Sequence, residues 1–114
     1  MGAWANGASG SGAEKPTTEG TLTPLGYAQH TSLGTAILLS ATPAAGVALP
    51  AGARLAVISC TAQAVRWRDD GTAPTATVGM PLAVGVQFTY SGDLSAIKFI
   101  EQASGAVLNV SFYK

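Results

Sequence analysis

The sequence has few charged residues. Asp, Glu, Lys and Arg make up 11% of its 114 residues, against about 25% in ordinary soluble domains. Six basic and six acidic residues cancel to a formal net charge of zero. A nucleic-acid binder needs a basic stripe that displaces counterions from phosphates, and Arg54, Arg66 and Arg68 do not make one. We therefore expect no nucleic-acid partner. We do expect association with other protein chains, because a weakly charged surface without net charge promotes it.

Cysteine and histidine each occur once, as Cys60 and His30. A single cysteine excludes an intrachain disulfide, and a metal site needs a cluster of ligands that the sequence does not offer. A Ser-His-Asp hydrolase is conceivable from composition, but His30 lies in an irregular segment with no nucleophile motif nearby. We interpret His30 as a hydrogen-bonded or interface residue. We expect no catalytic residue, no metal and no cofactor.

The sequence also lacks long apolar runs. No stretch approaches 18 uninterrupted apolar residues, so we expect no membrane span. The N-terminus has neither the basic region nor the long apolar region of a signal peptide, and Asn6 breaks the myristoylation pattern. These absences predict synthesis in a bacterial cytoplasm followed by assembly into something larger.

Residues 1–33 are expected to form an extended N-terminal arm and lead-in. Gly, Ala and Ser dominate the first 13 residues, a composition typical of flexible linkers, and Pro24 and Gly26 discourage regular structure further on. Two interpretations stay open, a disordered leader and an arm that orders upon assembly. The second is favoured by Trp4, because a flexible tail has no use for an indole unless it docks. The expected anchors on neighbouring subunits are Trp4, Leu22, Leu25, Tyr27 and Leu33.

Residues 34–114 are predicted to form an all-β domain, a small antiparallel β-sandwich of jelly-roll-like type. A spacing of about 8–12 residues between strands is typical of sandwiches and barrels, and no helical periodicity exceeds one turn. Because the connections between the last three strands are short, we expect these strands to form a meander. Strands are expected at 35–40, 54–60, 63–68, 76–78, 86–90, 95–101 and 107–113, with a long loop or bent edge segment at 42–52.

A strand with strict alternation precedes the most turn-rich segment of the chain. In this strand Val65 and Trp67 point to one face, while Arg66 and Arg68 point to the other. The alternation predicts one buried face and one face at a loop or an interface.

Two adjacent carboxylates, Asp69 and Asp70, follow this strand and precede Gly71. Aspartate bonds nearby backbone amides in turns, and glycine accepts a positive φ. With Asp93 these carboxylates could bind calcium, but the spacing matches no EF-hand loop. We favour turn chemistry or pairing with the two arginines of the preceding strand.

Aromatic residues occupy alternating strand positions. Core packing is the ordinary explanation for such a pattern. The alternative is a sugar-binding platform of exposed aromatics, formed by Trp67, Tyr90 or Tyr113. The alternating aromatic residues are Trp67, Phe88, Tyr90, Phe99, Phe112 and Tyr113.

Four motifs follow one another within residues 53–114. They are RWRDDGTAPT at 66–75, GMPL at 79–82, FTYSGDL at 88–94 and a closing LNVSFY strand at 108–113. By these motifs the chain resembles small structural proteins of tailed bacteriophages, and in general character it is similar to capsid decoration or cement proteins. Those proteins are about a hundred residues long and β-structured, frequently form trimers and often dock an N-terminal arm on the capsid lattice.

The resemblance implies a non-enzymatic virion protein on the capsid surface. It would bind the major capsid protein and copies of itself, as a homotrimer, and stabilise the head lattice through the β domain and the arm. A tail-associated structural or host-glycan-binding module is the alternative. A third hypothesis, an enzyme built on a His30–carboxylate pair, requires these groups within hydrogen-bond reach of each other.

Overall fold

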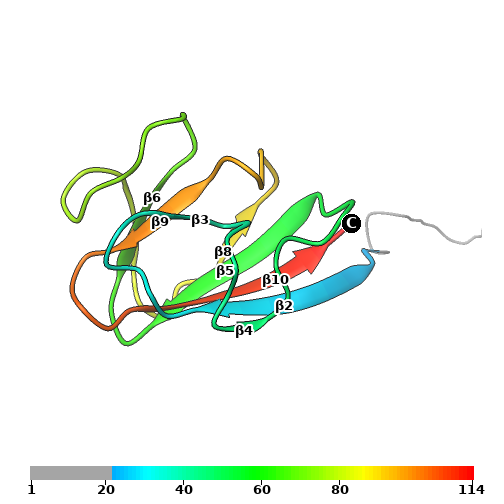
Figure 1. Ribbon diagram of the computed structural model, residues 1–114, viewed down its shortest axis with the longest axis horizontal. Helices are drawn as coiled ribbons and strands as arrows, with labels where there is room; N and C mark the ends of the chain where they lie inside the picture. Colours follow the sequence, from blue (N-terminus) through cyan, green and yellow to red (C-terminus); the bar gives the residue numbers. More distant parts are fainter. Residues whose placement is uncertain (1–21) are drawn as a thin grey trace, which may run out of the picture.

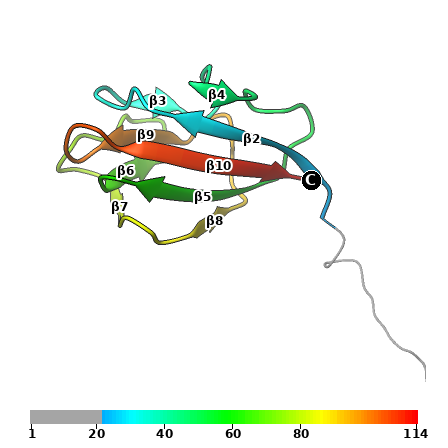
Figure 2. The same ribbon diagram turned by 90° about the horizontal axis from the view of Figure 1, so that it is seen from below.

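The computed structural model describes residues 22–114, which fold into two antiparallel β-sheets with no helix among them. The sheets lie face to face as two layers (Figures 1 and 2). The expected all-β fold is confirmed. The jelly-roll assignment stays a prediction, and Trp4 lies outside the described residues.

One sheet has five strands in the order β4-β2-β10-β5-β8, and the other has four in the order β3-β9-β6-β7. The five-stranded sheet contains β2 (Pro24–His30), β4 (Ala45–Gly46), β5 (Leu55–Thr61), β8 (Phe88–Tyr90) and β10 (Val107–Tyr113). The four-stranded sheet contains β3 (Ile37–Leu38), β6 (Val65–Arg68), β7 (Met80–Leu82) and β9 (Lys98–Glu101).

Strand β2 corrects the expectation of an irregular lead-in. Its residues pair with β10 along most of both strands, from Leu108 opposite His30 to Tyr113 opposite Pro24, with a register shift between Phe112 and Tyr113. Pro24 is tolerated because it is the first residue of the strand. A side chain at Gly26 would lie 2.5 Å from Cγ2 of Val47, so glycine allows a close approach here. The sandwich therefore begins before residue 34.

Two further expectations about strands are wrong. The last three strands form no meander, because β8 and β10 belong to the five-stranded sheet while β9 lies between β3 and β6 in the other. Residues 76–78 form a loop, and the strand follows at Met80–Leu82. This strand contains Pro81, which is acceptable because β7 is the edge of its sheet.

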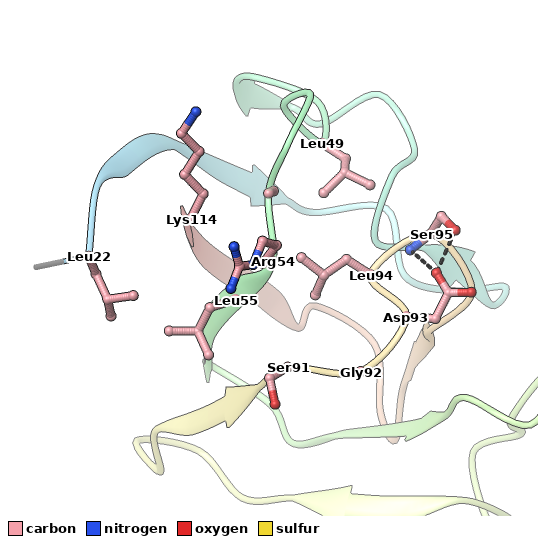
Figure 3. Close-up of a pocket in the computed structure, with 11 residues that line it drawn as sticks. Leu22, Leu49, Arg54, Leu55, Ser91, Gly92, Asp93, Leu94, Ser95 and Lys114 are labelled. Atoms are coloured by element: carbon pink, nitrogen blue, oxygen red, sulfur yellow. Dashed lines mark hydrogen bonds between the residues drawn. The ribbon is translucent and has the colours of Figure 1, made fainter. Parts of the chain in front are cut away.

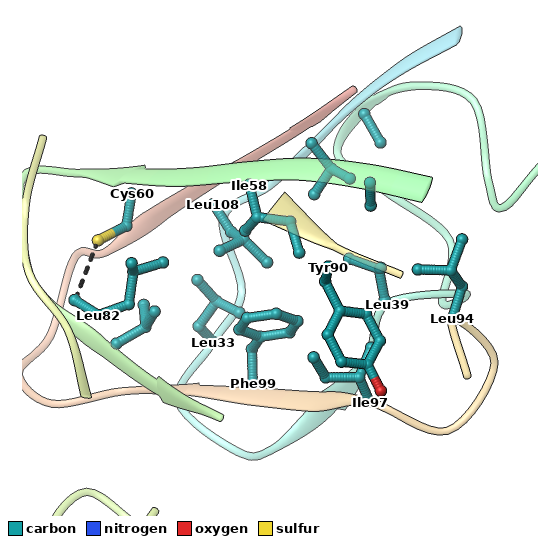
Figure 4. Close-up of a cluster of buried hydrophobic side chains, with 14 of the residues drawn as sticks. Leu33, Leu39, Ile58, Cys60, Leu82, Tyr90, Leu94, Ile97, Phe99 and Leu108 are labelled. Atoms are coloured by element: carbon teal, nitrogen blue, oxygen red, sulfur yellow. Dashed lines mark hydrogen bonds between the residues drawn. The ribbon is translucent and has the colours of Figure 1, made fainter. Parts of the chain in front are cut away.

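The core fills the space between the sheets (Figure 4). Alternate side chains of β10, those of Leu108, Val110 and Phe112, are buried there. Leu33 follows β2 and is fully buried in the core of its own chain. It therefore cannot anchor the chain to a neighbour. Other fully buried core residues are Leu39, Ile58, Cys60, Val65, Ile97 and Phe99.

Two truncations test where the domain begins. Deleting residues 1–21 is expected to leave a cooperatively folded protein, because both sheets lie within residues 22–114. Deleting residues 1–33 is expected to unfold it, because β10 loses its partner β2 and the core loses Leu33. Thermal unfolding followed by circular dichroism distinguishes the two. A cooperative transition in the shorter protein would contradict the assignment of β2.

Candidate functional site

His30 ends β2 and is 3% exposed. Its Nε2 atom has no hydrogen-bond partner. Burial lowers the pKa of His30 from its ordinary value of 6.5, and the nearby backbone of Leu39 partly opposes this effect. The residue lines a small cavity of about 210 Å³ with Thr31, Ser32, Ile37 and residues 41–44. No carboxylate lines this cavity, so the structure does not assemble the His30–carboxylate pair there.

The predicted Asp-Asp-Gly turn is present, and one of its carboxylates pairs with an arginine. Asp70 accepts hydrogen bonds from Nε of Arg68 at 3.1 Å and from the backbone of Thr72 at 3.3 Å. The Arg68 guanidinium holds the pKa of this carboxyl below its ordinary value. Gly71 has a φ of 88°, as its place in the turn predicts. The predicted pairing of Arg68 is confirmed.

The other predicted arginine partner, Arg66, binds backbone carbonyls. Its Nε donates to the Ala76 carbonyl at 3.1 Å and its Nη1 donates to the Gly79 carbonyl at 2.9 Å. A Cβ on Gly79 would lie 3.0 Å from Cβ of Pro74. Glycine at this position therefore allows the backbone to pass close to Pro74. Arg66 therefore holds the 75–79 loop against β6, and the prediction that it pairs with a carboxylate was wrong.

Three aromatic rings meet where β6 and β8 face each other across the sandwich. Trp67 stacks on Phe88 with ring centroids 4.9 Å apart and 20° between the planes, and its edge approaches Tyr90 at 6.0 Å. The Tyr90 hydroxyl donates to Asp69 at 2.7 Å. Burial, together with Asp69, raises the pKa of Tyr90 to about 12. Tyr90 is buried in this cluster, as core packing predicts, so the alternative platform of exposed aromatics does not include it.

A groove of about 510 Å³ lies beside this cluster, and we call it the Trp67 groove. Trp67 and the charged residues that follow it form one part of the lining, and Val78, Gly79 and Met80 form the other. Val78 and Met80 are 52% and 56% exposed. The groove thus combines an indole, two exposed apolar side chains and the charged turn. The charged residues that line it are Arg68, Asp69 and Asp70.

A second groove, of about 560 Å³, lies at the end of the sandwich where the described chain begins (Figure 3). Its carboxylate, Asp93, accepts hydrogen bonds from the backbone and the hydroxyl of Ser95 at 3.0 and 2.6 Å, which lower its pKa. The Asp93 carboxylate therefore stabilises the turn in which it lies. Apolar and basic residues complete most of the lining: Leu22, Leu49, Leu55, Leu94, Arg54 and Lys114.

The expected arm anchors are not brought together. Leu22 is 50% exposed and lines the second groove described above. Leu25 packs partly against the core. Tyr27 is 47% exposed, and its hydroxyl donates to Asn109 of β10 at 2.9 Å. Leu33 is in the core, as described above. Of the anchors within residues 22–114, only Leu22 and Tyr27 remain exposed enough to contact a neighbour.

The three carboxylates considered for calcium each have a separate partner. Asp69 accepts from Tyr90, Asp70 from Arg68, and Asp93 from Ser95. In the described part of the chain, no three His, Cys, Asp or Glu side chains gather where they could hold a metal ion. Within residues 22–114 there is likewise no helix of the length and hydropathy needed to cross a membrane.

The connection from β7 to β8 carries an exposed apolar pair, which sequence reasoning missed. Val84 and Val86 are each 50% exposed. The connection that contains them joins β7, the edge strand of one sheet, to β8, the edge strand of the other. It runs along one side of the sandwich (Figure 2). The sequence has no charged residue between Asp70 and Asp93, a signal that could have located this uncharged side. We call residues 83–87 the β7–β8 connection.

His30 predicts a loss of stability in mild acid. Its pKa is lowered in the folded state, so the unfolded chain takes up the proton first as the pH falls. The free energy of unfolding should therefore be constant above the unfolded pKa of about 6.5 and decrease below it, by at most about 1.4 kcal/mol per pH unit. Urea unfolding at several pH values between about 7 and 5 measures this slope.

A His30→Gln variant is the control, because glutamine does not titrate and can still hydrogen-bond. Its stability should be independent of pH over the same range, which lies above the ordinary pKa of aspartate. An equal slope in the variant and in the unchanged protein would show that other groups cause the effect.

The chain was also compared with known proteins. No protein-family model, no curated protein and no solved structure matches it. The likeness of residues 53–114 to phage structural proteins therefore stays a prediction from its motifs.

Proposed function

We propose that the protein is a non-enzymatic structural subunit of a tailed-bacteriophage virion, a decoration protein on the capsid surface. It binds copies of itself, as a homotrimer, and the major capsid protein. The β7–β8 connection is the observation that carries this proposal. There the chain exposes Val84 and Val86 in a stretch without charge.

The side of the sandwich that β7 and β8 form exposes apolar side chains and carries no charge. Both edge strands have only three residues and β7 contains Pro81, features that hinder the addition of a further strand, so contact through the exposed side chains is favoured instead. Here both edge strands on this side, β7 and β8, lie within the segment between Asp70 and Asp93 that has no charge. Association with another protein removes the exposed valines from water, which favours binding by roughly 25 cal/mol per Å² of apolar surface.

Side chains, and not an added strand, are expected to make the contact at β7. Pro81 is the middle residue of this three-residue strand and has no backbone N–H to donate. In a trimer, three β7–β8 connections can surround the symmetry axis, where each touches both neighbours. A specific interface buries about 800 Å² per partner, so the two valines would be the centre of a larger contact.

Two charge substitutions test self-association through this connection. Val84→Glu and Val86→Glu should each turn the trimer into a monomer, because a carboxylate would be buried without a partner. Light scattering during size-exclusion chromatography measures the mass, and circular dichroism confirms that the variants fold.

Val47→Glu is the matched control. Val47 is 47% exposed and follows β4, the opposite edge strand of the five-stranded sheet. This variant should remain trimeric. A monomeric unchanged protein, or equal dissociation of Val47→Glu, would contradict the assigned contact.

Attachment to the particle is tested by deleting residues 1–20. The truncated protein should fold but occupy fewer sites on heads of the tailed phage that encodes it, because the expected anchor Trp4 is lost. Cosedimentation with purified heads, quantified by gel densitometry, gives the occupancy. Occupancy equal to that of the full chain would remove the arm from the proposal, and failure of the full chain to cosediment would overturn the capsid role.

A further inference from the structure

The Trp67 groove has a composition that neither the fold nor the proposed capsid role explains. We infer that it binds a neutral saccharide, with one pyranose ring lying against the indole of Trp67. This inference goes beyond the proposed structural function and does not depend on it. The groove's volume of about 510 Å³ is within the usual range for small-molecule sites, about 300–1,000 Å³.

Trp67, the aromatic residue that lines the groove, is held in place by two neighbouring rings. Phe88 stacks on one face of Trp67, and Tyr90 lies near its edge, so only the remaining surface of the indole can face a ligand. The π face of an aromatic ring is negative, and it attracts the weakly positive C–H groups on the flat side of a pyranose. An indole fixed by its neighbours loses little conformational entropy on binding.

The loop that contributes Val78 and Gly79 to the lining is also fixed. Arg66 holds the loop through the carbonyls of Ala76 and Gly79, and the Thr75 hydroxyl accepts from the backbone N–H of Val78 at 3.0 Å. These bonds position Val78 and its neighbours without using any groove-facing charge. The cost of ordering a loop upon ligand binding is thereby reduced.

The charged rim selects for a neutral, hydroxyl-bearing ligand. Arg68 is ion-paired with Asp70, and Asp69 accepts from Tyr90, so the arginine is not available as a lone positive charge for a phosphate. A carboxylate has about four acceptor sites, so both aspartates keep capacity for hydroxyl donors. A purely aliphatic ligand would leave these acceptors without new partners. A sugar supplies both hydroxyls and an apolar face.

The groove and the proposed self-contact adjoin each other at Met80 of β7. The 69–79 loop lies at the end of the molecule away from Lys114, beside which the described chain begins (Figure 1). The proposed self-contact uses Val84 and Val86, whereas the groove uses Val78 and Met80. Trp67, Asp70 and Val78 lie outside β7 and the β7–β8 connection, so the part of the groove that they line stays outside the proposed self-contact.

Saccharide binding is tested on the full chain with Trp4→Phe, which leaves Trp67 as the single tryptophan. The probes are methyl glycosides of glucose, galactose, mannose and N-acetylglucosamine, followed by a glycan array. Binding should shift the Trp67 emission and move the amide NMR signals of Asp70 and Gly79. Inorganic phosphate should do neither. If no saccharide moves these signals, or phosphate does so instead, the inference is overturned.

Matched carboxylate variants show where the sugar binds. Asp70→Asn should weaken binding about tenfold, because the hydroxyl groups lose a charged acceptor. Asp93→Asn changes another exposed turn carboxylate, outside the groove, and should bind normally. Val78→Glu places a larger, charged side chain in the groove and should also weaken binding. This variant provides the test if Asp70→Asn does not fold. Equal effects of Asp70→Asn and Asp93→Asn would exclude this groove.

The outcome is independent of assembly. Val86→Glu, whether monomeric or trimeric, should bind the same saccharide as the unchanged protein. Loss of sugar binding in this variant alone would place the site at the β7–β8 connection and overturn the assignment to Trp67.

Discussion

The pairing of β10 on both sides is the constraint on which the rest of the structure depends. Its residues are opposite β2 on one side and β5 on the other along nearly the whole strand. Alternate side chains, Leu108, Val110 and Phe112, point into the space between the sheets. Because residues 22–30 and 107–114 are brought together in this way, the two ends of the described chain form one unit. Thr23 and Lys114 even exchange two backbone hydrogen bonds, at 2.9 and 3.0 Å.

This arrangement leaves functional surfaces to the edges and loops. The faces between the sheets are filled by the core, and Cys60 is buried there with its thiol near the carbonyl oxygens of Leu82 and Ala83. Burial raises the pKa of this thiol, which makes it unreactive. Four exposed apolar residues, Val78, Met80, Val84 and Val86, lie in or beside β7, in the Trp67 groove and on the β7–β8 connection. The proposed self-contact and the inferred saccharide site would thus use adjoining parts of one side.

Local patterns in the sequence were predictive where the interaction itself is local. The inward residues of β10 follow from alternation, and the Arg68–Asp70 pair spans two positions in the chain. The contact between Asp69 and Tyr90 joins residues 21 apart, and no spacing rule indicates it. Alternation also shows which side chains are buried but not which strand is the neighbour. That is why the expected meander was wrong. Pro24 and Gly26 suggested irregular chain, although a first strand position and a close contact with Val47 explain them better.

Pro81 has a consequence for how copies of the chain can stack. A strand aligned against the outer side of β7 would present a carbonyl that finds no N–H donor at Pro81, and an unsatisfied polar group is costly once water is excluded. Growth of a continuous sheet from molecule to molecule, the route to fibrils, is therefore blocked at this edge. Pro81 thus leaves the side chains of this uncharged, apolar side exposed while it hinders the addition of a further strand at β7.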